Sequence, residues 1–195
     1  KDPENAAFQR AAASNYKSLA YIFDATGDYD AVVNNNRTAI SLLEKLVAAA
    51  PNDFALTLEI SGCLKSLGDA IASKGDLEGA LRNYRQTLAN SEEVLRADPS
   101  NRQAKTMIAT ACDAIGTTLG NPNFTNLGDT DGALRLYARE LEIVEELLKD
   151  DGASQWLRAT KAQSLKVIGE VRSARREWES AKESYRAALE IQEDL

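Results

Sequence analysis

Apolar residues recur three and four positions apart along most of the chain, and charged residues fill the positions between them. This spacing is typical of amphipathic α-helices. Pro3, Pro51, Pro99 and Gly152 interrupt the pattern, and turn-forming residues divide each interval once more. The sequence therefore predicts an all-α protein of eight long helices. Their expected ranges are 4–26, 28–49, 52–74, 76–97, 100–119, 129–150, 153–175 and 177–194.

A longer period runs through these helices. Gly-Asp pairs occur at 27–28, 75–76 and 128–129, and Arg176-Glu177 holds the fourth position, so the intervals are 48, 53 and 48 residues. We expect the glycine to end one helix and the aspartate to cap the next. The chain is thus interpreted as a single domain, 1–195, with four helix-turn-helix repeats at 3–50, 51–98, 99–151 and 152–195.

The third repeat is five residues longer than the others, and the extra residues fall in "GNPNFTNLGD", residues 120–129. Glycine, asparagine and proline favour turns, so we predict an insertion between two helices near 120–127. Phe124 in this insertion has two interpretations. Its ring is either a recognition element on the loop or, as we favour, packs back against the neighbouring helices.

A short motif recurs before each turn: "YKSLA", "LKSLG", "CDAIG" and "LKVIG" begin at residues 16, 64, 112 and 165. After the turn an aromatic residue stands at Tyr84, Tyr137 and Tyr185, whereas the first copy has Asn36. This pattern resembles the tetratricopeptide (TPR) repeat, although that unit has about 34 residues, and the longer unit here resembles the repeats of kinesin light chains. The resemblance implies a right-handed α-solenoid whose first helices line a concave groove.

The segment "NPNFTNLGDTDGALRLYARELEI" is similar to helical repeat regions that follow the catalytic domain of bacterial serine/threonine kinases. That likeness implies a scaffolding or sensing segment of a larger signalling protein. The Gly-rich and HRD motifs of a kinase do not occur in this chain. Because it begins at Lys1 without methionine, we expect a fragment. A cytoplasmic location is favoured, and a membrane segment before residue 1 would make it extracytoplasmic.

Composition disfavours several functions. The 30 acidic and 23 basic residues leave a net charge of −7, which disfavours nucleic-acid partners, and no apolar run is long enough to enter a membrane. The chain has no histidine, and Cys63 and Cys112 lie in apolar helical runs, so we expect neither enzyme activity, metal nor cofactor. The densest acidic cluster is interpreted as a solvated helix face: Glu140, Glu142, Glu145 and Glu146.

The resemblance places ligand contacts on the first helices, at two positions per repeat. These candidates for a protein or peptide ligand are Lys17, Lys65, Asp113 and Lys166, with Tyr21, Asp69, Thr117 and Glu170 four residues later. The lysines point to an acidic or carboxylate-bearing peptide. A second interpretation is that Lys65 with Asp69, and Lys166 with Glu170, form surface ion pairs at i,i+4 spacing.

Self-association is the alternative function. No polar helix follows the last repeat in this chain, so apolar positions such as Tyr185, Ala188 and Leu189 lack the helix that would cover them. We expect this C-terminal end to be open or to pack against another copy in a homo-oligomer.

Overall fold

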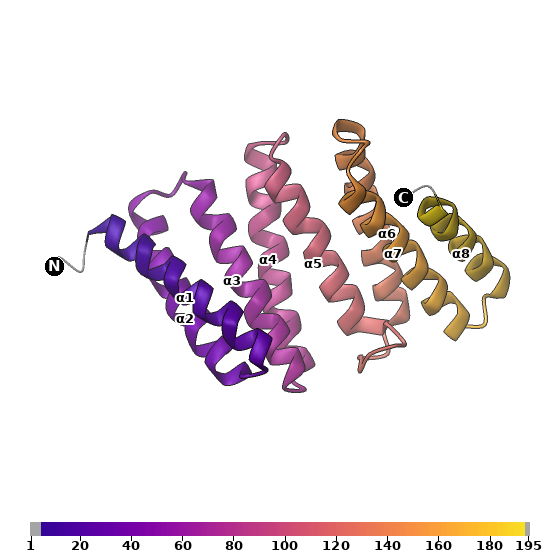
Figure 1. The fold of residues 1–195 in the computed structure, drawn as a ribbon, viewed down its shortest axis with the longest axis horizontal. Coiled ribbons are helices and arrows are strands. Elements are labelled where there is room, and N and C mark those ends of the chain that lie inside the picture. Colours follow the sequence, from indigo (N-terminus) through magenta and orange to yellow (C-terminus); the bar gives the residue numbers. More distant parts are fainter. Residues whose placement is uncertain (1–4, 194–195) are drawn as a thin grey trace. The chain divides into compact units, whose positions relative to one another are not determined.

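The computed structural model describes residues 5–193, and these form eight α-helices and no strand (Figure 1). The helices are α1 (Ala6–Thr26), α2 (Tyr29–Ala49), α3 (Phe54–Ser73), α4 (Leu77–Ala97), α5 (Arg102–Gly120), α6 (Thr130–Asp150), α7 (Gln155–Ala174) and α8 (Trp178–Glu193). The prediction of an α-solenoid built from eight helices is confirmed. Two of the predicted helix limits, residues 4 and 194, lie outside the described residues.

The helix starts follow the period of the sequence. First helices begin at residues 6, 54, 102 and 155, and second helices at 29, 77, 130 and 178. The successive differences are therefore 48, 48 and 53 for the first set and 48, 53 and 48 for the second. Each copy is a helical hairpin, and the third copy carries its extra residues between its two helices.

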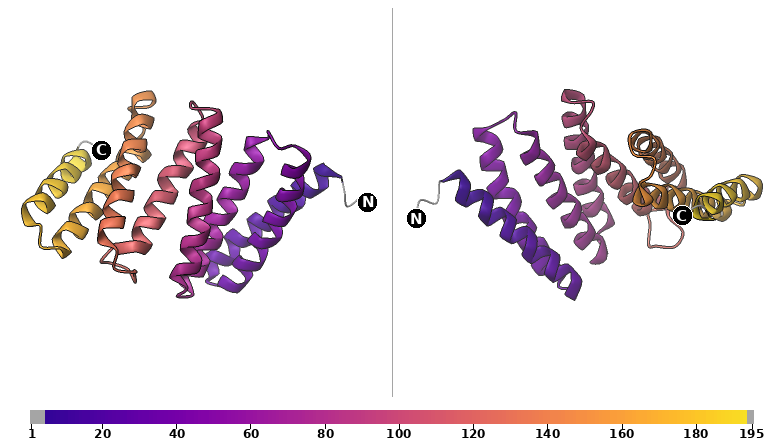
Figure 2. Two further views of the ribbon diagram at one scale, coloured as in Figure 1. Left: turned by 180° about the vertical axis from the view of Figure 1, so that it is seen from behind. Right: turned by 45° about the horizontal axis from the view of Figure 1, so that its top comes forward.

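The chain divides into two compact units at Met107, which lies within α5. Unit 1 comprises α1 to α4 with the start of α5, and unit 2 comprises the rest of α5 with α6 to α8. Within unit 1, Figures 1 and 2 show α1 to α4 packed side by side in alternating directions. The single domain, 1–195, expected from the repeats stays a prediction.

The Gly-Asp turns have the predicted geometry. Glycines 27, 75 and 128 adopt left-handed backbone conformations, with φ of 76°, 90° and 80°. The following aspartate accepts a hydrogen bond from a first-turn amide in each case: Asp28 from Ala31, Asp76 from Gly79 and Asp129 from Gly132. In the fourth hairpin Arg176 takes the glycine's place, at a φ of 64°.

A tyrosine packed onto a glycine holds the two helices of a hairpin together in three of the four copies. The Tyr84 ring lies so close to Gly68 that an added Cβ would be 2.5 Å from it, and the corresponding distances are 3.0 Å at Gly116 and 2.8 Å at Gly169. The helices can approach this closely because glycine has no side chain. In the first hairpin the glycine is replaced by Ala20, and the tyrosine by the smaller Asn36.

Small and aliphatic side chains fill the core of each unit. In unit 1, Leu43 and Cys63 are among the residues that pack between the first and second hairpins. In unit 2, Val144, Leu147 and Leu157 form a cluster with Ala109. Neither cysteine forms a disulfide and both are buried, as the sequence predicts for small apolar side chains.

Asparagine side chains organise the inserted loop, which joins α5 to α6 through residues 121–129. Asn121 is buried, and its Oδ1 accepts a hydrogen bond from the Asn123 amide at 3.0 Å. Asn126 Nδ2 donates to the carbonyls of Asn121 and Phe124, while its Oδ1 accepts from the Gly128 amide. The loop is therefore an ordered turn whose backbone groups are satisfied by local side chains.

Candidate functional site

The two candidate lysines of unit 1 already have carboxylate partners. Lys17 Nζ lies 3.0 Å from Glu59 Oε2, and Arg10 contacts the other oxygen of Glu59 at 2.9 Å. Burial alone would raise the pKa of Glu59, but hydrogen bonds and charges from Lys17 and Arg10 outweigh it and lower that pKa. Lys65 pairs with Asp69 at 2.8 Å. A ligand carboxylate would have to compete with these internal partners.

Two of the four candidates that lie four residues later, Asp69 and Thr117, contact the tyrosines of their own hairpins. The Tyr84 hydroxyl donates to Asp69 Oδ1 at 2.9 Å, and the Thr117 and Tyr137 hydroxyls are 3.0 Å apart. These contacts fix the ring that packs on the glycine of the same hairpin. Tyr21 differs because Asn36 replaces the tyrosine opposite it, and 74% of Tyr21 is exposed.

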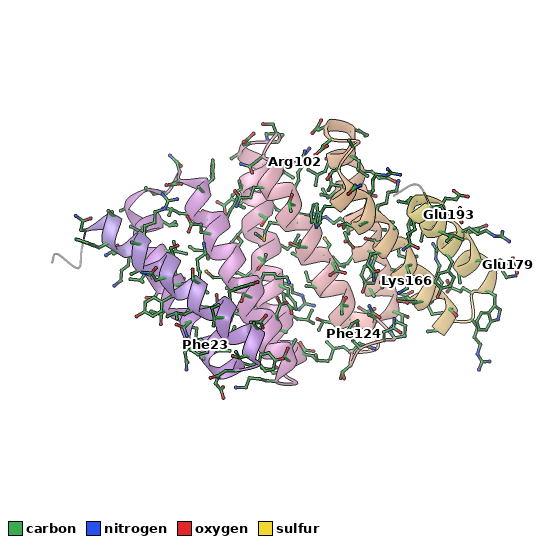
Figure 3. The ribbon with its side chains drawn as sticks, in the orientation of Figure 1. Phe23, Arg102, Phe124, Lys166, Glu179 and Glu193 are labelled. Carbon is green, nitrogen blue, oxygen red and sulfur yellow. The ribbon has the colours of Figure 1, made fainter. Side chains whose placement is uncertain are left out.

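In unit 2 the candidate Lys166 and Glu170 are linked to the inserted loop. Lys166 Nζ lies 3.5 Å from Glu170 Oε1, and Asn123 Nδ2 donates to Glu170 Oε2 at 2.7 Å. The loop is thus fastened to α7 by a charged side chain. Figure 3 shows Lys166 and Phe124 on this part of the molecule. That the candidates of both units line one continuous groove stays a prediction.

Phe124 does not pack back against the helices, so the interpretation favoured from the sequence is wrong. Its side chain is 62% exposed, and Leu127 in the same loop is 41% exposed. The physical reason is that the asparagine hydrogen bonds hold the loop without help from the ring. The recognition interpretation of Phe124 stays a prediction.

Unit 1 has a small pocket beside Tyr21. Its volume is about 270 Å³, and its lining includes Lys17, Tyr21, Asn36 and Cys63. Asn36 is buried, and its Nδ2 donates to the Val32 carbonyl at 3.1 Å and to Ser66 Oγ at 3.0 Å. The amide group is therefore already used inside the fold.

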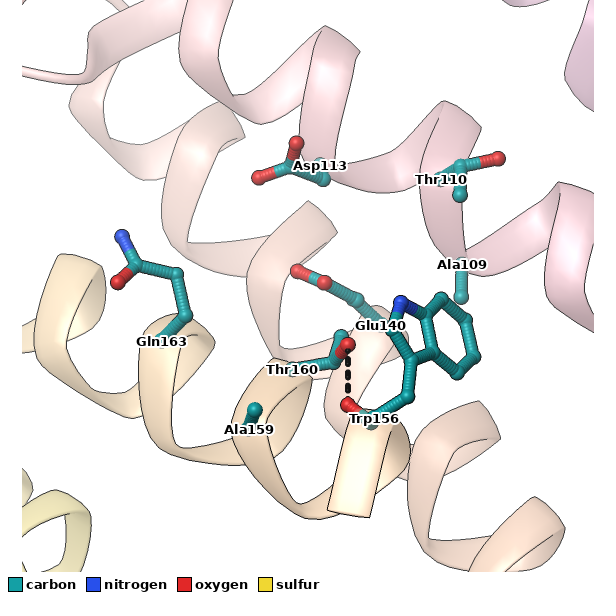
Figure 4. Close-up of a pocket in the computed structure, with 8 residues that line it drawn as sticks. All are labelled: Ala109, Thr110, Asp113, Glu140, Trp156, Ala159, Thr160 and Gln163. Atoms are coloured by element: carbon teal, nitrogen blue, oxygen red, sulfur yellow. Dashed lines mark hydrogen bonds between the residues drawn. The ribbon is translucent and has the colours of Figure 1, made fainter. Parts of the chain in front are cut away.

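Unit 2 has a larger pocket, of about 390 Å³, between α5, α6 and α7 (Figure 4). Helix α5 contributes Asp113, α6 contributes Glu140, and α7 contributes Trp156, Thr160 and Gln163. Asp113 is exposed at the opening, and 55% of Trp156 is exposed. Of the candidates predicted from sequence, Asp113 alone belongs to this pocket.

Glu140 is buried, which corrects its interpretation as part of a solvated helix face. Only 4% of the residue is exposed, and its Oε2 has no hydrogen-bond partner. Burial raises the pKa of Glu140 to about 8, the negative charge of Asp113 adds to the increase, and a hydrogen bond with Ser164 opposes it. A buried carboxyl group with a raised pKa in a pocket marks a candidate functional site.

The repeat period contains a signal that could have identified Glu140. Residues 48 or 53 positions apart are equivalent, which aligns Glu140 with Ala39, Thr87 and Ala188. All three are buried, at 0%, 0% and 4% exposure. A glutamate aligned with small buried residues is expected to have its first side-chain atoms buried as well. The sequence interpretation missed the burial of Glu140 because it grouped this residue with its neighbours on α6. Those neighbours, Glu142, Glu145 and Glu146, do lie on the exposed face.

Among residues 5–193, no group of three or more histidine, cysteine, aspartate or glutamate side chains is placed to hold a metal ion. Within the same residues, no helix has the length and apolar character needed to cross a membrane.

The sequence matches no protein-family model and no curated protein. The fold, however, is similar to solved structures. The crystal structure of BtubC (BKLC) from P. vanneervenii superimposes with a TM-score of 0.69 at 16% sequence identity. The match covers 93% of this chain and 63% of BtubC, so this chain spans less than two thirds of its length.

Two further structures are more distant. The MamA protein has a TM-score of 0.42 at 14% identity and covers 93% of this chain and 92% of its own. The nearly identical TPR-like repeats described for Podosopora anserina kinesin light chain have a TM-score of 0.37 at 15% identity, covering 92% and 93%. The resemblance to TPR-like repeats is confirmed at the level of the fold by the four helical hairpins and by the similarity to BtubC.

Proposed function

We propose that this chain is a protein-interaction module that binds an extended peptide or protein segment through its first helices. One observation supports this most directly: each unit presents a pocket on its first helices with a large exposed aromatic side chain beside it. In unit 1 the ring is Tyr21, 74% exposed, and in unit 2 it is Trp156, 55% exposed.

An aromatic side chain left in water forgoes the burial that usually stabilises a fold, and such residues are enriched where proteins bind partners. Trp156 illustrates this, because its equivalents in the other repeats are Ala7, Ala55 and Gln103. These are also exposed, so the fold does not require a large ring at this position. A ligand that covers Trp156 would gain the free energy of burying the indole ring, which folding leaves exposed.

Tryptophan fluorescence can be used to test this function. It contains two tryptophans, Trp156 and Trp178. Replacing Trp178 with phenylalanine leaves Trp156 as the sole tryptophan, so its fluorescence then reports on the unit 2 pocket. A random peptide library displayed on phage can be panned against the 195-residue chain, and selected peptides titrated against this variant.

We expect selected peptides to shift or quench Trp156 fluorescence, and Trp156→Ala or Tyr21→Ala to weaken their binding. The matched control is Gln103→Ala, at the position equivalent to Trp156 in the preceding repeat. Failure to select any peptide that binds the wild-type chain, or selected peptides that bind both aromatic variants unchanged, would contradict the proposal.

The parent protein is a finer part of the proposal. We propose that the module belongs to a larger bacterial signalling protein such as a serine/threonine kinase, on the likeness of residues 121–143 to kinase-associated repeats. Recovering the full-length reading frame tests this, because a kinase domain must then precede Lys1.

Self-association is the second candidate, and α8 carries the observation that favours it. Leu189 is 53% exposed and Tyr185 is 38% exposed on this helix, while Ala188 is buried. Light scattering over a range of concentrations separates the two functions. A mass that rises with concentration in the wild type but not in Leu189→Glu supports self-association, and a constant monomer mass excludes it.

A further inference from the structure

We propose that the pocket lined by Asp113, Glu140 and Trp156 binds the side chain of a lysine or arginine in the partner segment. This inference rests on the proposed peptide-binding function and names the chemistry that one of its pockets recognises. It differs from the expectation drawn from the sequence, in which lysines of this chain attract an acidic peptide.

The first support is the unsatisfied carboxyl group in the pocket. Glu140 Oε2 is buried and has no hydrogen-bond partner, whereas buried polar atoms in folded proteins are nearly always paired. Asp113 brings a second carboxylate to the same pocket from α5 (Figure 4). An ammonium or guanidinium group has only donors, so it can pair with the unsatisfied Glu140 oxygen while lying beside the Asp113 carboxylate.

The second support is the aromatic side chain beside these acids. The Trp156 indole lines the pocket, and tryptophan offers the most favourable ring face for an organic cation. The Thr160 hydroxyl bonds to the backbone and not to the ring, because Thr160 Oγ1 donates to the Trp156 carbonyl oxygen at 2.9 Å. The arrangement combines two carboxyl groups with a ring, which suits a cation carried on an aliphatic stem.

The pocket is large enough to admit a lysine or arginine side chain. Its volume of about 390 Å³ is near the lower end of the roughly 300–1,000 Å³ typical of ligand pockets. A hard metal ion fits less well. Calcium takes six to eight oxygen ligands and magnesium about six, whereas the titratable oxygen ligands here come from Asp113 and Glu140.

The fold provides no reason of its own for a glutamate at this position. The equivalent residues Ala39, Thr87 and Ala188 fill the same place in the other hairpins with small side chains. Burying a carboxyl group instead destabilises the fold. Departures from local rules that weaken a fold tend to occur at functional sites.

The charge of the surrounding repeat favours the approach of a basic segment. Residues 99–151 contain nine acidic and five basic residues, a net charge of −4. Lys161 follows the pocket residue Thr160 on α7, and its Nζ is paired with Glu145 Oε1 at 2.7 Å. A basic partner would therefore be steered toward unit 2, and its binding would weaken as salt is added.

Binding of a cation must also release a proton. The groups that act on Glu140 are the Asp113 carboxylate from α5 and the Ser164 hydroxyl from α7, and Tyr137 is the titratable neighbour on α6 itself. Because the pKa of Glu140 is raised to about 8, much of this carboxyl group is protonated at neutral pH. A cation favours the ionised form, so affinity should rise between about pH 6 and pH 8.

The test uses the full chain carrying Trp178→Phe, with Trp156 fluorescence as the readout. The probes are two blocked pentapeptides of alanine, one with a central arginine and one with a central citrulline. Citrulline has the shape of arginine without its charge. We expect the arginine peptide to bind at least about tenfold more tightly than the citrulline peptide, because hydrogen bonds between charged groups are stronger than neutral ones.

Three variants localise the effect. Glu140→Gln should weaken arginine binding by roughly tenfold or more and abolish its pH dependence, and Asp113→Asn should weaken it less because that carboxylate is exposed. Glu142→Gln changes the same charge on the exposed face of α6 and should leave binding unaltered. Calorimetry in buffers with different ionisation enthalpies should detect proton release in the wild type but not in Glu140→Gln.

Equal binding of the two pentapeptides, or unchanged arginine binding in Glu140→Gln, would overturn the inference. So would quenching of Trp156 by calcium or magnesium that the arginine peptide cannot reverse. If phage-selected peptides bind at Trp156 but contain no basic residue, the interaction module stands and only the cationic pocket is wrong. If neither selected peptides nor the arginine peptide bind, both proposals fail.

Discussion

Replacing Glu140 with glutamine should stabilise the fold, and the gain should increase with pH. The substitution keeps the shape of the side chain and removes a carboxyl group that is 4% exposed with one unpaired oxygen. Its pKa is raised from an ordinary 4.5 to about 8, chiefly by burial and next by the charge of Asp113. The folded protein therefore keeps a proton that the unfolded chain releases near pH 4.5.

The sign and size of the effect follow from this difference. Between about pH 4.5 and 8 unfolding releases one proton, so the free energy of unfolding falls as pH rises, by about 1.4 kcal/mol per pH unit. From pH 5 to pH 7 the wild type should lose roughly 2–3 kcal/mol that Glu140→Gln retains. For a chain of this length, each kcal/mol corresponds to a shift in Tm of about 2–4 °C.

Thermal unfolding followed by circular dichroism at pH 5, 6, 7 and about 8 measures the effect. Wild type and Glu140→Gln should have similar Tm values at the acidic end and differ by roughly 5–10 °C at neutral pH. Other groups titrate in both proteins, so the difference between them isolates Glu140. Asp113→Asn should reduce the pH dependence, and Glu142→Gln controls for the loss of one negative charge. A gap between wild type and Glu140→Gln that does not change with pH would refute the reasoning.

Three further substitutions probe the fold. Arg176→Gly should raise the free energy of unfolding by roughly 1 kcal/mol in urea titrations, because arginine is strained at a φ of 64° where the other hairpins have glycine. Gly68→Ala should lower it by about 1–3 kcal/mol, since the new Cβ would lie 2.5 Å from the buried Tyr84 ring. Glu59→Gln should lower it by roughly 1–2 kcal/mol at neutral pH by removing the partner of Lys17. Because the pKa of Glu59 is lowered, that deficit should shrink as pH falls below the ordinary pKa of glutamate, and a deficit independent of pH would contradict it.

The helices and turns could be predicted from sequence because their causes are local. A helix start depends on a capping aspartate and the next few amides, and Asp28, Asp76 and Asp129 cap as predicted. The extra residues of the third repeat also appear where the period required them, between Gly120 and Thr130. Repetition added information, because a pattern present several times identifies the positions that matter.

The sequence determined less about the surface. An aromatic residue in a loop is apolar whether it is packed or exposed, and only the hydrogen-bonded path of residues 121–129 decides that Phe124 is exposed. The contacts and exposure of the candidate groove residues likewise depend on the side chains that the fold places beside them. Asp69 and Thr117 contact tyrosine hydroxyls of their own hairpins, whereas Tyr21 is exposed in the hairpin that has Asn36 in place of a tyrosine.

The unit 2 pocket shows most clearly which features follow from the sequence and which depend on tertiary packing. The sequence alone determined the repeat register, and that register contained the information that Glu140 stands where Ala39, Thr87 and Ala188 are buried. Only the tertiary structure brought Asp113, Glu140 and Trp156 together, because they lie on three different helices and are separated by 27 and 16 residues along the chain. The pKa of a carboxyl group depends on the solvent and charges that packing places around it. Helix periodicity describes one helix at a time, and this environment is produced by three.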